Sequence, residues 1–241
     1  MNQSAANARS FGQQWAGFEY QRTWGGTIAD RRTGFLADIG QPPDWFEGRR
    51  VLDAGCGAGT LSYAISTLGC EVVGIDVSSS VVAARERFPV IEFIQADISD
   101  PPDLGLFDVI YSGSVLHHLP DPHAAFGKLV PLLAPGGFIY VWLYWRVAGR
   151  TYAFKSALRR LPLPYSARRL LSVPFALQGA MRDRSLSLRE HRLAQHDFFT
   201  PRWRSEHTPE EVLGWCEEFS LRGTLRSTSR DGFGVLARHY G

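Results

Sequence analysis

The chain has 241 residues, an apolar content of 44% and a formal net charge of +2. This length fits one domain with a substantial hydrophobic core, and the near-balanced charge gives no reason by itself to expect a nucleic-acid partner. The longest apolar run, 138–145, has the length of a strand and is much shorter than the roughly 20 residues that span a bilayer.

Three cysteines, Cys56, Cys70 and Cys216, lack the spacing of a metal-ligand set. An odd number of cysteines without such spacing predicts reduced thiols in a cytoplasmic protein that holds no metal. The first ten residues are polar and lack the apolar core of a signal peptide.

The N-terminal segment is rich in aromatic side chains for a region that precedes the first predicted strand. Their spacing of three to four residues predicts a helix that packs on the domain. The residues are Phe11, Trp15, Phe18, Tyr20 and Trp24.

A short apolar run at 51–52 ends in Asp53 and opens into a Gly-x-Gly-x-Gly turn at Gly55, Gly57 and Gly59. This pattern predicts a buried parallel strand that leads into a tight loop and a helix. Glycine lets the backbone adopt positive φ and approach a ligand closely. Since open α/β sheets bind ligands at the carboxyl ends of their strands, we predict a nucleoside-bearing cofactor here.

The spacing of the glycines argues against a dinucleotide. Dinucleotide folds favour Gly-x-Gly-x-x-Gly, whereas here the third glycine comes one residue early. The acidic Asp53 suits a ligand with an amino group or a sulfonium better than it suits a pyrophosphate. Cys56 lies inside this turn, and no activating side chain is near it in sequence, so a small residue that fits is a better interpretation than a nucleophile.

Four more strands are predicted from apolar runs that follow at intervals of about one helix. The run at 71–76 ends in Asp76, whose carboxylate could accept hydrogen bonds from both ribose hydroxyls; the alternative is that it caps the next helix with Ser78 or Ser79. The run at 93–97 ends in Asp97. The fourth and fifth runs are 107–112 and 138–144, the latter after a turn at 134–137.

These segments together resemble the class I S-adenosylmethionine-dependent methyltransferases over about residues 47–145, beginning with Val-Leu-Asp-Ala-Gly-Cys-Gly-Ala-Gly-Thr at 51–60. The resemblance implies an α/β fold: a Rossmann-like, doubly wound, seven-stranded sheet, mostly parallel with an antiparallel last strand. It also implies S-adenosylmethionine as the cofactor and methyl transfer as the activity. A helical cap inserted after strand five is expected to cover the substrate.

In that family Asp97 would face the adenine amino group, Ile98 would lie against the ring, and the N-terminal segment would form a lid. Aromatic faces near a sulfonium gain cation–π attraction of roughly 0.5–2 kcal/mol, which favours Tyr20 and Trp24 in the lid. The full set of cofactor-binding residues implied is Asp53, Gly55, Cys56, Gly57, Gly59, Asp76, Val77, Asp97, Ile98, Ser112, Tyr20 and Trp24.

The segment after the fifth predicted strand is strongly basic. Residues 146–204 contain 13 Arg and Lys against three acids. Phe154, Leu158 and Leu161 would form one helical face, with Lys155 and Arg159 off it. A second pattern from 165 should end or kink at Pro174. Three interpretations stay open: a solvated helical cap, a site for an anionic substrate such as a phosphorylated or nucleotide-linked sugar, and contact with an anionic membrane surface.

The C-terminal segment predicts a helix and a hairpin. Thr208-Pro209-Glu210-Glu211 combines a capping box with a proline at the first helical position. Two strands, 221–229 and 233–240, flank an Asp-Gly turn at 231–232. The stretch 197–215 also resembles, more loosely, the C-terminal signature of bacterial methyltransferases found with sugar- or polysaccharide-modifying enzymes.

Methyl transfer needs alignment of the acceptor with the methyl group, and a general base only where the acceptor must lose a proton. His117 and His118 follow the fourth predicted strand and are the candidate bases. Adjacent residues point in different directions, so we expect at most one in the pocket, with His117 preferred. Both could instead serve the fold. His207 is a third candidate.

A small-molecule acceptor, most simply a hydroxyl of a sugar or secondary metabolite, is the predicted substrate, and no nucleic-acid partner is expected. Strand four ends Tyr-Ser-Gly-Ser at 111–114, unlike the proline-containing box of enzymes that methylate nucleobase amines. Alternatives are a lipid-linked or nucleotide-linked glycan acceptor at the membrane surface, an NAD-dependent oxidoreductase, and a non-catalytic cofactor-binding protein. The predicted organisation is an N-terminal lid (1–46), a cofactor-binding core (47–145), a basic cap (146–205) and a closing helix with its hairpin (206–241).

Overall fold

The computed structural model describes residues 26–161, 163–185, 187–201 and 203–240. These residues form two compact units: one contains the chain up to Arg146 and again from Ser205, and the other is Val147–Arg204. The predicted aromatic lid residues Phe11, Trp15, Phe18, Tyr20 and Trp24 lie outside the described residues.

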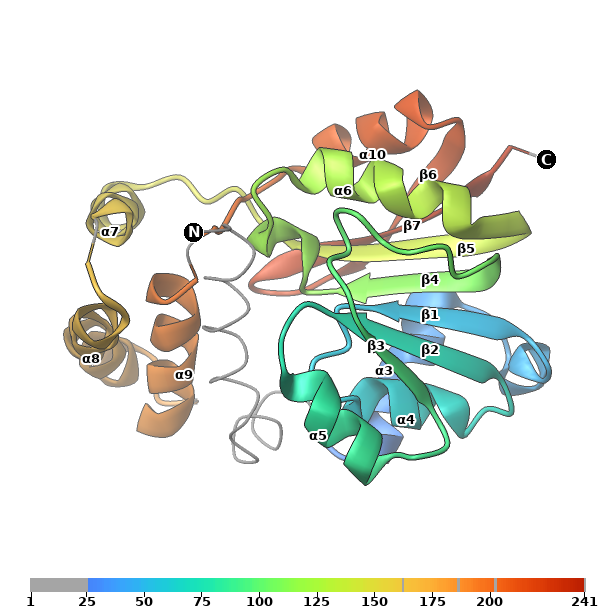
Figure 1. Ribbon diagram of the computed structural model, residues 1–241. Coiled ribbons are helices and arrows are strands. Elements are labelled where there is room, and N and C mark those ends of the chain that lie inside the picture. The colour runs from blue at the N-terminus through green and yellow to red at the C-terminus, as the bar shows by residue number, and fades with distance from the viewer. Residues whose placement is uncertain (1–25, 162, 186, 202, 241) are drawn as a thin grey trace. The chain divides into compact units, whose positions relative to one another are not determined.

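The first unit is built on one mixed sheet, shown in Figure 1. Its strand order, over the described residues, is β3-β2-β1-β4-β5-β7-β6. The pairs among β1 to β5 are parallel, whereas β7 runs antiparallel to both β5 and β6. The strands are β1 (Arg50–Ala54), β2 (Glu71–Asp76), β3 (Glu92–Gln95), β4 (Phe107–Gly113), β5 (Leu133–Tyr144), β6 (Leu221–Thr228) and β7 (Gly232–His239).

Helices cover both faces of this sheet (Figure 1). On one face lie α3 (Ile28–Ile39), α4 (Thr60–Ser66) and α5 (Ser80–Arg87); on the other lie α6 (Pro122–Leu129) and α10 (Pro209–Glu218). Short 3-10 turns complete the unit: η1 (Pro43–Phe46), η2 (Leu116–His118) and η3 (Val130–Leu132).

The apolar runs of the sequence become strands that are buried on both faces. In β1, Leu52 and Ala54 pack into the core beneath α6 and α10, while Val51 packs into the core beneath α3, α4 and α5. This two-sided burial is why the parallel strands are continuous apolar runs. The predicted Rossmann-like sheet with an antiparallel closing strand is confirmed.

A buried polar cluster fixes α3 on the sheet. The Tyr111 hydroxyl donates to Asp38 Oδ2 at 2.9 Å, and the Tyr140 hydroxyl donates to Asp38 Oδ1 at 2.8 Å. The two rings stack with their centroids 4.9 Å apart. Burial raises the pKa of the Asp38 carboxyl, and the bonds from the two tyrosines oppose that rise. The cluster therefore joins α3 to neighbouring strands β4 and β5.

Some boundaries differ from the sequence prediction. The stretch 134–137, predicted as a turn before the fifth strand, falls within the bounds of β5, where the register with β4 shifts between Phe107 and Val109. At the C-terminal end, Thr208 accepts from the Glu211 amide at 3.3 Å as the cap of α10, and β6 and β7 form the predicted hairpin.

The second unit contains three helices among its described residues: α7 (Arg150–Arg160), α8 (Tyr165–Arg182) and α9 (Leu188–Phe199). The helix predicted from residue 165 was expected to end or kink at Pro174. It does not end there, because α8 continues to Arg182. Proline removes the hydrogen bond to the carbonyl of residue 170. Leu170 and Pro174 are both exposed, so water can satisfy that carbonyl.

The apolar face predicted for α7 lies largely in solvent. Phe154 and Leu161 are exposed, whereas Lys155 and Arg159 are half-buried. Lys155 Nζ donates to Gln195 Oε1 at 2.6 Å and lies 4.2 Å from the centroid of the Phe198 ring. Arg159 Nη2 donates to the Arg204 carbonyl at 3.1 Å. Burial lowers the pKa of Lys155 to about 8. Over the described residues, no helix combines the length and apolar composition needed to cross a membrane.

Packing around the glycine turn gives a test of the fold. At Gly59, φ is 75° and an added Cβ would lie 2.5 Å from the buried Phe93 ring; at Gly48, φ is 70° and an added Cβ meets nothing within 4 Å. We expect Gly48→Ala to cost about 1–2 kcal/mol for the left-handed backbone. Gly59→Ala should cost a further 1–3 kcal/mol or so from overpacking.

Urea denaturation of the two variants measures this difference, and Gly48→Ala is the matched control for backbone strain. Equal losses of unfolding free energy in the two variants would contradict the close packing of Gly59 against Phe93.

Candidate active site

The predicted cofactor residues lie where parallel strands end at one edge of the sheet. Asp53 is in register with Gly74 of β2 and with Tyr111 of β4, and Asp76 is the last residue of β2. The loop after β1 contains three glycines with positive φ, at 96° for Gly55, 55° for Gly57 and 75° for Gly59. Parallel pairing therefore brings Asp53, Asp76 and the glycine turn together.

Asp76 links the glycine turn to the second strand. The Gly57 amide donates to Asp76 Oδ2 at 2.9 Å, and the Ser78 amide donates to Asp76 Oδ1 at 2.8 Å. The alternative raised from the sequence, that Asp76 caps the next helix, is wrong, because α5 begins at Ser80 and its N-cap Ser79 has no side-chain cap bond. Each carboxylate oxygen has a second lone pair, so these bonds leave capacity to accept from a ligand.

Asp53 is 3% exposed and accepts from the Ser62 hydroxyl at 2.6 Å. Burial raises the pKa of Asp53 to about 6; the Ser62 bond and the charge of Arg31 oppose the rise, and the charge of Asp76 adds to it. Burial likewise lowers the pKa of the Arg31 guanidinium, against the favourable charge of Asp53. The Asp53 carboxyl of β1 and the Arg31 guanidinium of α3 therefore interact electrostatically in the same region.

The remaining predicted residues surround this edge. Asp97 accepts at Oδ1 from the Ser99 amide at 2.9 Å and the Ser99 hydroxyl at 2.6 Å, and Ile98 is buried in the core. The Val77 carbonyl accepts from Gln95 Nε2 at 3.1 Å. Ser112 is buried and donates to the Ala54 carbonyl at 3.1 Å. Tyr20 and Trp24 lie outside the described residues, so their lid role stays a prediction.

The surroundings of the cysteine in the turn do not activate its thiol. Cys56 is buried, and burial raises the pKa of its thiol well above the usual value, with the charges of Asp53 and Asp76 adding to the rise. A thiol that stays protonated reacts slowly. Among the described residues, His, Cys, Asp and Glu side chains form no group of three that could hold a metal ion.

The loop after β4 carries both candidate bases. Val115 packs against Gly55, where its methyl groups occupy the space that a Cβ would need. His117 and His118 follow in η2, are 0% and 6% exposed, and have ring centroids 4.3 Å apart. The His117 ring also lies 4.1 Å from the Tyr144 ring at the end of β5. Both histidines are therefore buried beside the ends of β4 and β5.

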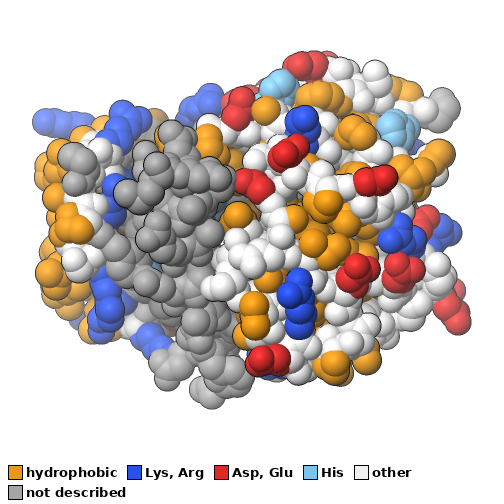
Figure 2. Space-filling view, in the orientation of Figure 1, with side chains coloured by type: hydrophobic (Ala, Val, Ile, Leu, Met, Phe, Trp, Pro, Cys, Tyr) orange, Lys and Arg blue, Asp and Glu red, His pale blue; other side chains and the backbone are white. Residues whose placement is uncertain are grey.

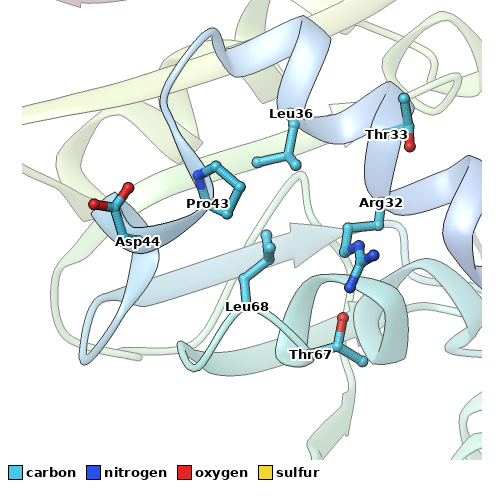
Figure 3. A pocket seen from close by; sticks show the side chains of 7 residues that line it. All are labelled: Arg32, Thr33, Leu36, Pro43, Asp44, Thr67 and Leu68. Carbon is cyan, nitrogen blue, oxygen red and sulfur yellow. The ribbon is translucent and has the colours of Figure 1, made fainter.

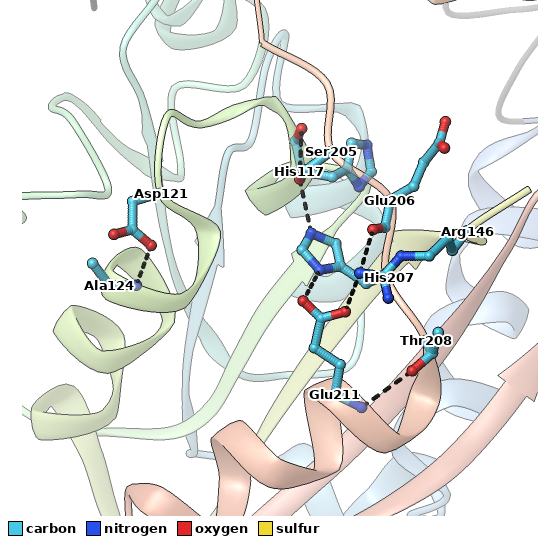
Figure 4. A network of polar contacts seen from close by, with 9 residues as sticks. All are labelled: His117, Asp121, Ala124, Arg146, Ser205, Glu206, His207, Thr208 and Glu211. Carbon is cyan, nitrogen blue, oxygen red and sulfur yellow. Dashed lines mark hydrogen bonds and ion pairs between the residues drawn. The ribbon is translucent and has the colours of Figure 1, made fainter. Parts of the chain in front are cut away.

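A polar network, shown in Figure 4, holds the backbone of His117. The Ser205 amide donates to the His117 carbonyl at 2.8 Å, and Ser205 Oγ lies 2.8 Å from His207 Nε2. His207 Nδ1 lies 3.0 Å from Glu211 Oε1, while Glu211 Oε2 accepts from Arg146 Nη2 at 2.6 Å. His207 is thus a supporting residue behind His117, and its hydrogen bonds join β5, the 205–207 segment and α10.

Glu211 has a perturbed acidity in this network. Burial acts to raise the pKa of its carboxyl, but the His207 hydrogen bond and the charges of His207 and Arg146 outweigh burial and lower it. Sequence reasoning had assigned Glu211 only to a capping box.

A depression of 450 Å³ lies elsewhere in the first unit (Figure 3). It is lined by Arg32, Thr33 and Leu36 of α3, Pro43 and Asp44 of η1, and Thr67 and Leu68 after α4. The glycine turn precedes α4, whereas Thr67 and Leu68 follow it. The depression is therefore at the opposite end of α4 from the predicted cofactor residues.

Sequence reasoning missed two contributors to the site. Arg31 lies on a helix that was not predicted individually, and the capping box at Thr27 and Asp30 was the available signal for its start. Ser205 is a lone serine in a loop, and its bond to His117 spans 88 positions, so no local pattern reveals it.

Sequence comparison relates the chain to methyltransferases. A methyltransferase-domain profile matches residues 52–139. The ubiquinone biosynthesis O-methyltransferase of Xanthomonas campestris pv. campestris is 36% identical over 101 residues, which is 39% of this chain and 42% of that protein. The protein of the same description from Albidiferax ferrireducens is 29% identical over 185 residues, 69% of this chain and 71% of that protein. The chain thus spans less than half the length of the first curated relatives that it matches.

The fold also matches solved structures. The N-methyltransferase NodS from Bradyrhizobium japonicum in complex with S-adenosyl-L-homocysteine aligns with a TM-score of 0.60 at 17% identity, covering 98% of this chain and 99% of that one. The DhpI complex with the same ligand aligns with a TM-score of 0.62 at 16% identity, covering 98% and 96%.

The matching profile, the strand order 3-2-1-4-5-7-6 and the carboxylates around the glycine turn agree with one another. The family predicted from the sequence, and S-adenosylmethionine as its cofactor, are confirmed. Residues 52–139 belong to a methyltransferase domain, and the fold around them is the one predicted from the sequence for the class I S-adenosylmethionine-dependent methyltransferases.

Proposed function

We propose that this chain transfers a methyl group from S-adenosylmethionine to a hydroxyl of a small molecule, such as a sugar or a phenolic metabolite. The observation that carries the proposal is the 2.9 Å hydrogen bond from the Gly57 amide to Asp76, which joins the glycine turn to the carboxylate at the end of β2. The O-methyltransferase description of the curated relatives favours oxygen as the accepting atom.

The chemistry of the side chains fits the parts of this cofactor. Asp76 would accept from the ribose hydroxyls, and Asp97 with Ile98 would flank the adenine. The amino acid end of the cofactor carries an ammonium and a carboxylate, which match the opposite charges of Asp53 and Arg31 at the same edge. Gly55, Gly57 and Gly59, with Cys56, Val77 and Ser112, would form the surrounding wall.

The cofactor supplies a methyl group on a positively charged sulfur, which any correctly placed nucleophile can accept. A hydroxyl acceptor must also lose its proton. We assign the role of the base that accepts this proton to His117, with His118 as the alternative. The network of Ser205, His207 and Glu211 holds the His117 backbone in place.

The first test is calorimetric titration of the full chain with S-adenosylhomocysteine and, separately, with NADH. We expect micromolar binding of the first and none of the second. Asp76→Asn should weaken binding of S-adenosylhomocysteine at least tenfold, because charge-assisted hydrogen bonds contribute roughly 1.5–3 kcal/mol each.

Asp103→Asn is the matched control, since Asp103 also accepts from a backbone amide, at 3.2 Å from Gly105, but precedes β4 instead of following a strand. Binding of NADH alone would remove the proposed function. Equal affinities for Asp76→Asn and the control would remove the ribose role of Asp76.

The raised pKa of Asp53 predicts a proton linkage. At pH 6 about half of the Asp53 carboxyls in the free protein hold a proton, and a ligand ammonium favours the ionised form. Binding of S-adenosylhomocysteine should therefore release about half a proton at pH 6 and almost none at pH 8. Affinity should fall as the pH drops below about 6.

Calorimetry in two buffers with different ionisation enthalpies measures the released proton. The control ligand 5′-methylthioadenosine lacks the amino acid end and should release none. If Asp53→Asn releases as much as the unsubstituted chain, the linkage belongs to another group.

A third prediction concerns the base. His117→Asn should lower kcat by about 10²–10⁴ with the best phenol or sugar acceptor, because an unassisted hydroxyl is a weak nucleophile. Affinity for S-adenosylhomocysteine should not change. The control is His123→Asn, which changes a partly exposed histidine of α6 that pairs with Glu218. Unchanged kcat in His117→Asn would transfer the role to His118 or to no histidine.

A further inference from the structure

Helix α8 carries apolar side chains on two faces. On the inner face, Ala176 is fully buried and the Phe175 ring lies 5.3 Å from the Phe199 ring of α9. On the outer face, Leu170, Leu177 and Met181 are 72%, 48% and 73% exposed. The inner face is covered by α9, whereas the outer apolar side chains are left in solvent.

The exposed side chains of α8 form one continuous stripe. Leu170, Pro174, Leu177 and Met181 follow one another at intervals of four, three and four residues, the spacing of a single helical face. Each of the four is exposed. Scattered apolar residues on a surface need no explanation, but a stripe of this kind indicates a binding face.

Helix α7 exposes a second stripe with the same spacing. Phe154 is 58% exposed, Leu161 is 45% exposed, and the exposed Ala157 lies between them. Lys155 and Arg159 turn into the unit instead, at the cost of partial burial of two charges. We call the exposed residues of α7 and α8, with the arginines beside them, the outer face of the second unit.

The charge of this face has one sign. Neither α7 nor α8 contains an Asp or a Glu. Figure 2 shows orange and blue side chains over this part of the molecule. The exposed cations beside the stripes are Arg150, Arg160, Arg169, Arg182 and Arg184.

We propose that the outer face of the second unit binds the surface of an anionic phospholipid bilayer. Amphipathic helices that lie in this interface place apolar side chains at the boundary between headgroups and acyl chains and basic side chains among the phosphates. Arginine forks bind phosphate oxygens in pairs. A nucleic-acid partner would use the arginines but leave Leu170, Leu177 and Met181 in water. The proposal does not depend on the methyl-transfer activity.

Flotation of the full chain with vesicles tests the proposal. Vesicles of phosphatidylcholine with one quarter phosphatidylglycerol should bind the chain at 20 mM salt at least tenfold more tightly than pure phosphatidylcholine vesicles. Salt at 0.5 M should weaken binding, because it screens the attraction to the anionic headgroups. Leu170→Ser/Met181→Ser, which keeps every charge, should lower vesicle affinity at least tenfold.

The matched control is Val90→Ser/Leu225→Ser, which removes two apolar side chains of the first unit that are 82% and 43% exposed. Binding of S-adenosylhomocysteine should be the same in both double variants, and this readout separates failure of the present proposal from failure of the proposed function. Circular dichroism of the two variants checks that the second unit keeps its helices.

Three outcomes would overturn the proposal. The first is no flotation of the folded chain at 20 mM salt. The second is equal vesicle affinity of the two double variants. The third is a concentration-dependent dimer in vesicle-free solution that Leu170→Ser/Met181→Ser converts to monomer, which would assign the outer face to a second copy of the chain.

Discussion

The hydrogen bond from the Gly57 amide to Asp76 is the contact on which the arrangement of the site depends. It ties the turn after β1 to the end of β2, so the groups that each presents to a ligand have a fixed spacing. The turn packs closely because Gly59 and Gly55 have no Cβ atoms. Phe93 and Val115 occupy the space that those atoms would need. Val115 in turn positions the loop that carries His117.

A second constraint acts from α3. Asp38, held by Tyr111 and Tyr140, fixes one point of this helix on the sheet. Arg31 lies seven residues earlier, which is two helical turns, so both side chains share one helix face. The tyrosine contacts thereby set where Arg31 lies relative to Asp53. The polar core of the fold and the charge balance of the site thus depend on the same helix.

The sequence predicts this fold well wherever a local pattern has a single physical meaning. A short apolar run that ends in an acid and a glycine turn indicates a two-sided buried strand, and the strands ending near Asp53 and Asp76 are found. No local pattern predicts an orientation that depends on a distant residue. The orientation of Lys155 depends on Gln195 and that of Arg159 on Arg204, 40 and 45 positions away. At Pro174 the helix does not end, because the carbonyl that loses its hydrogen bond lies on an exposed face, where water can bond to it.

The chain leaves the first unit and returns to it at neighbouring points. The Arg146 amide donates to the His207 carbonyl at 2.9 Å, and the His207 amide donates to the Tyr144 carbonyl at 3.0 Å. The 58 residues of Val147–Arg204 are therefore an insertion between two adjacent backbone positions. An insertion of this kind can be exchanged for one of another length or composition without a change in the sheet register. The architecture is modular: one cofactor-binding framework can accept different inserted segments, and chimeras joined at these two positions would preserve it.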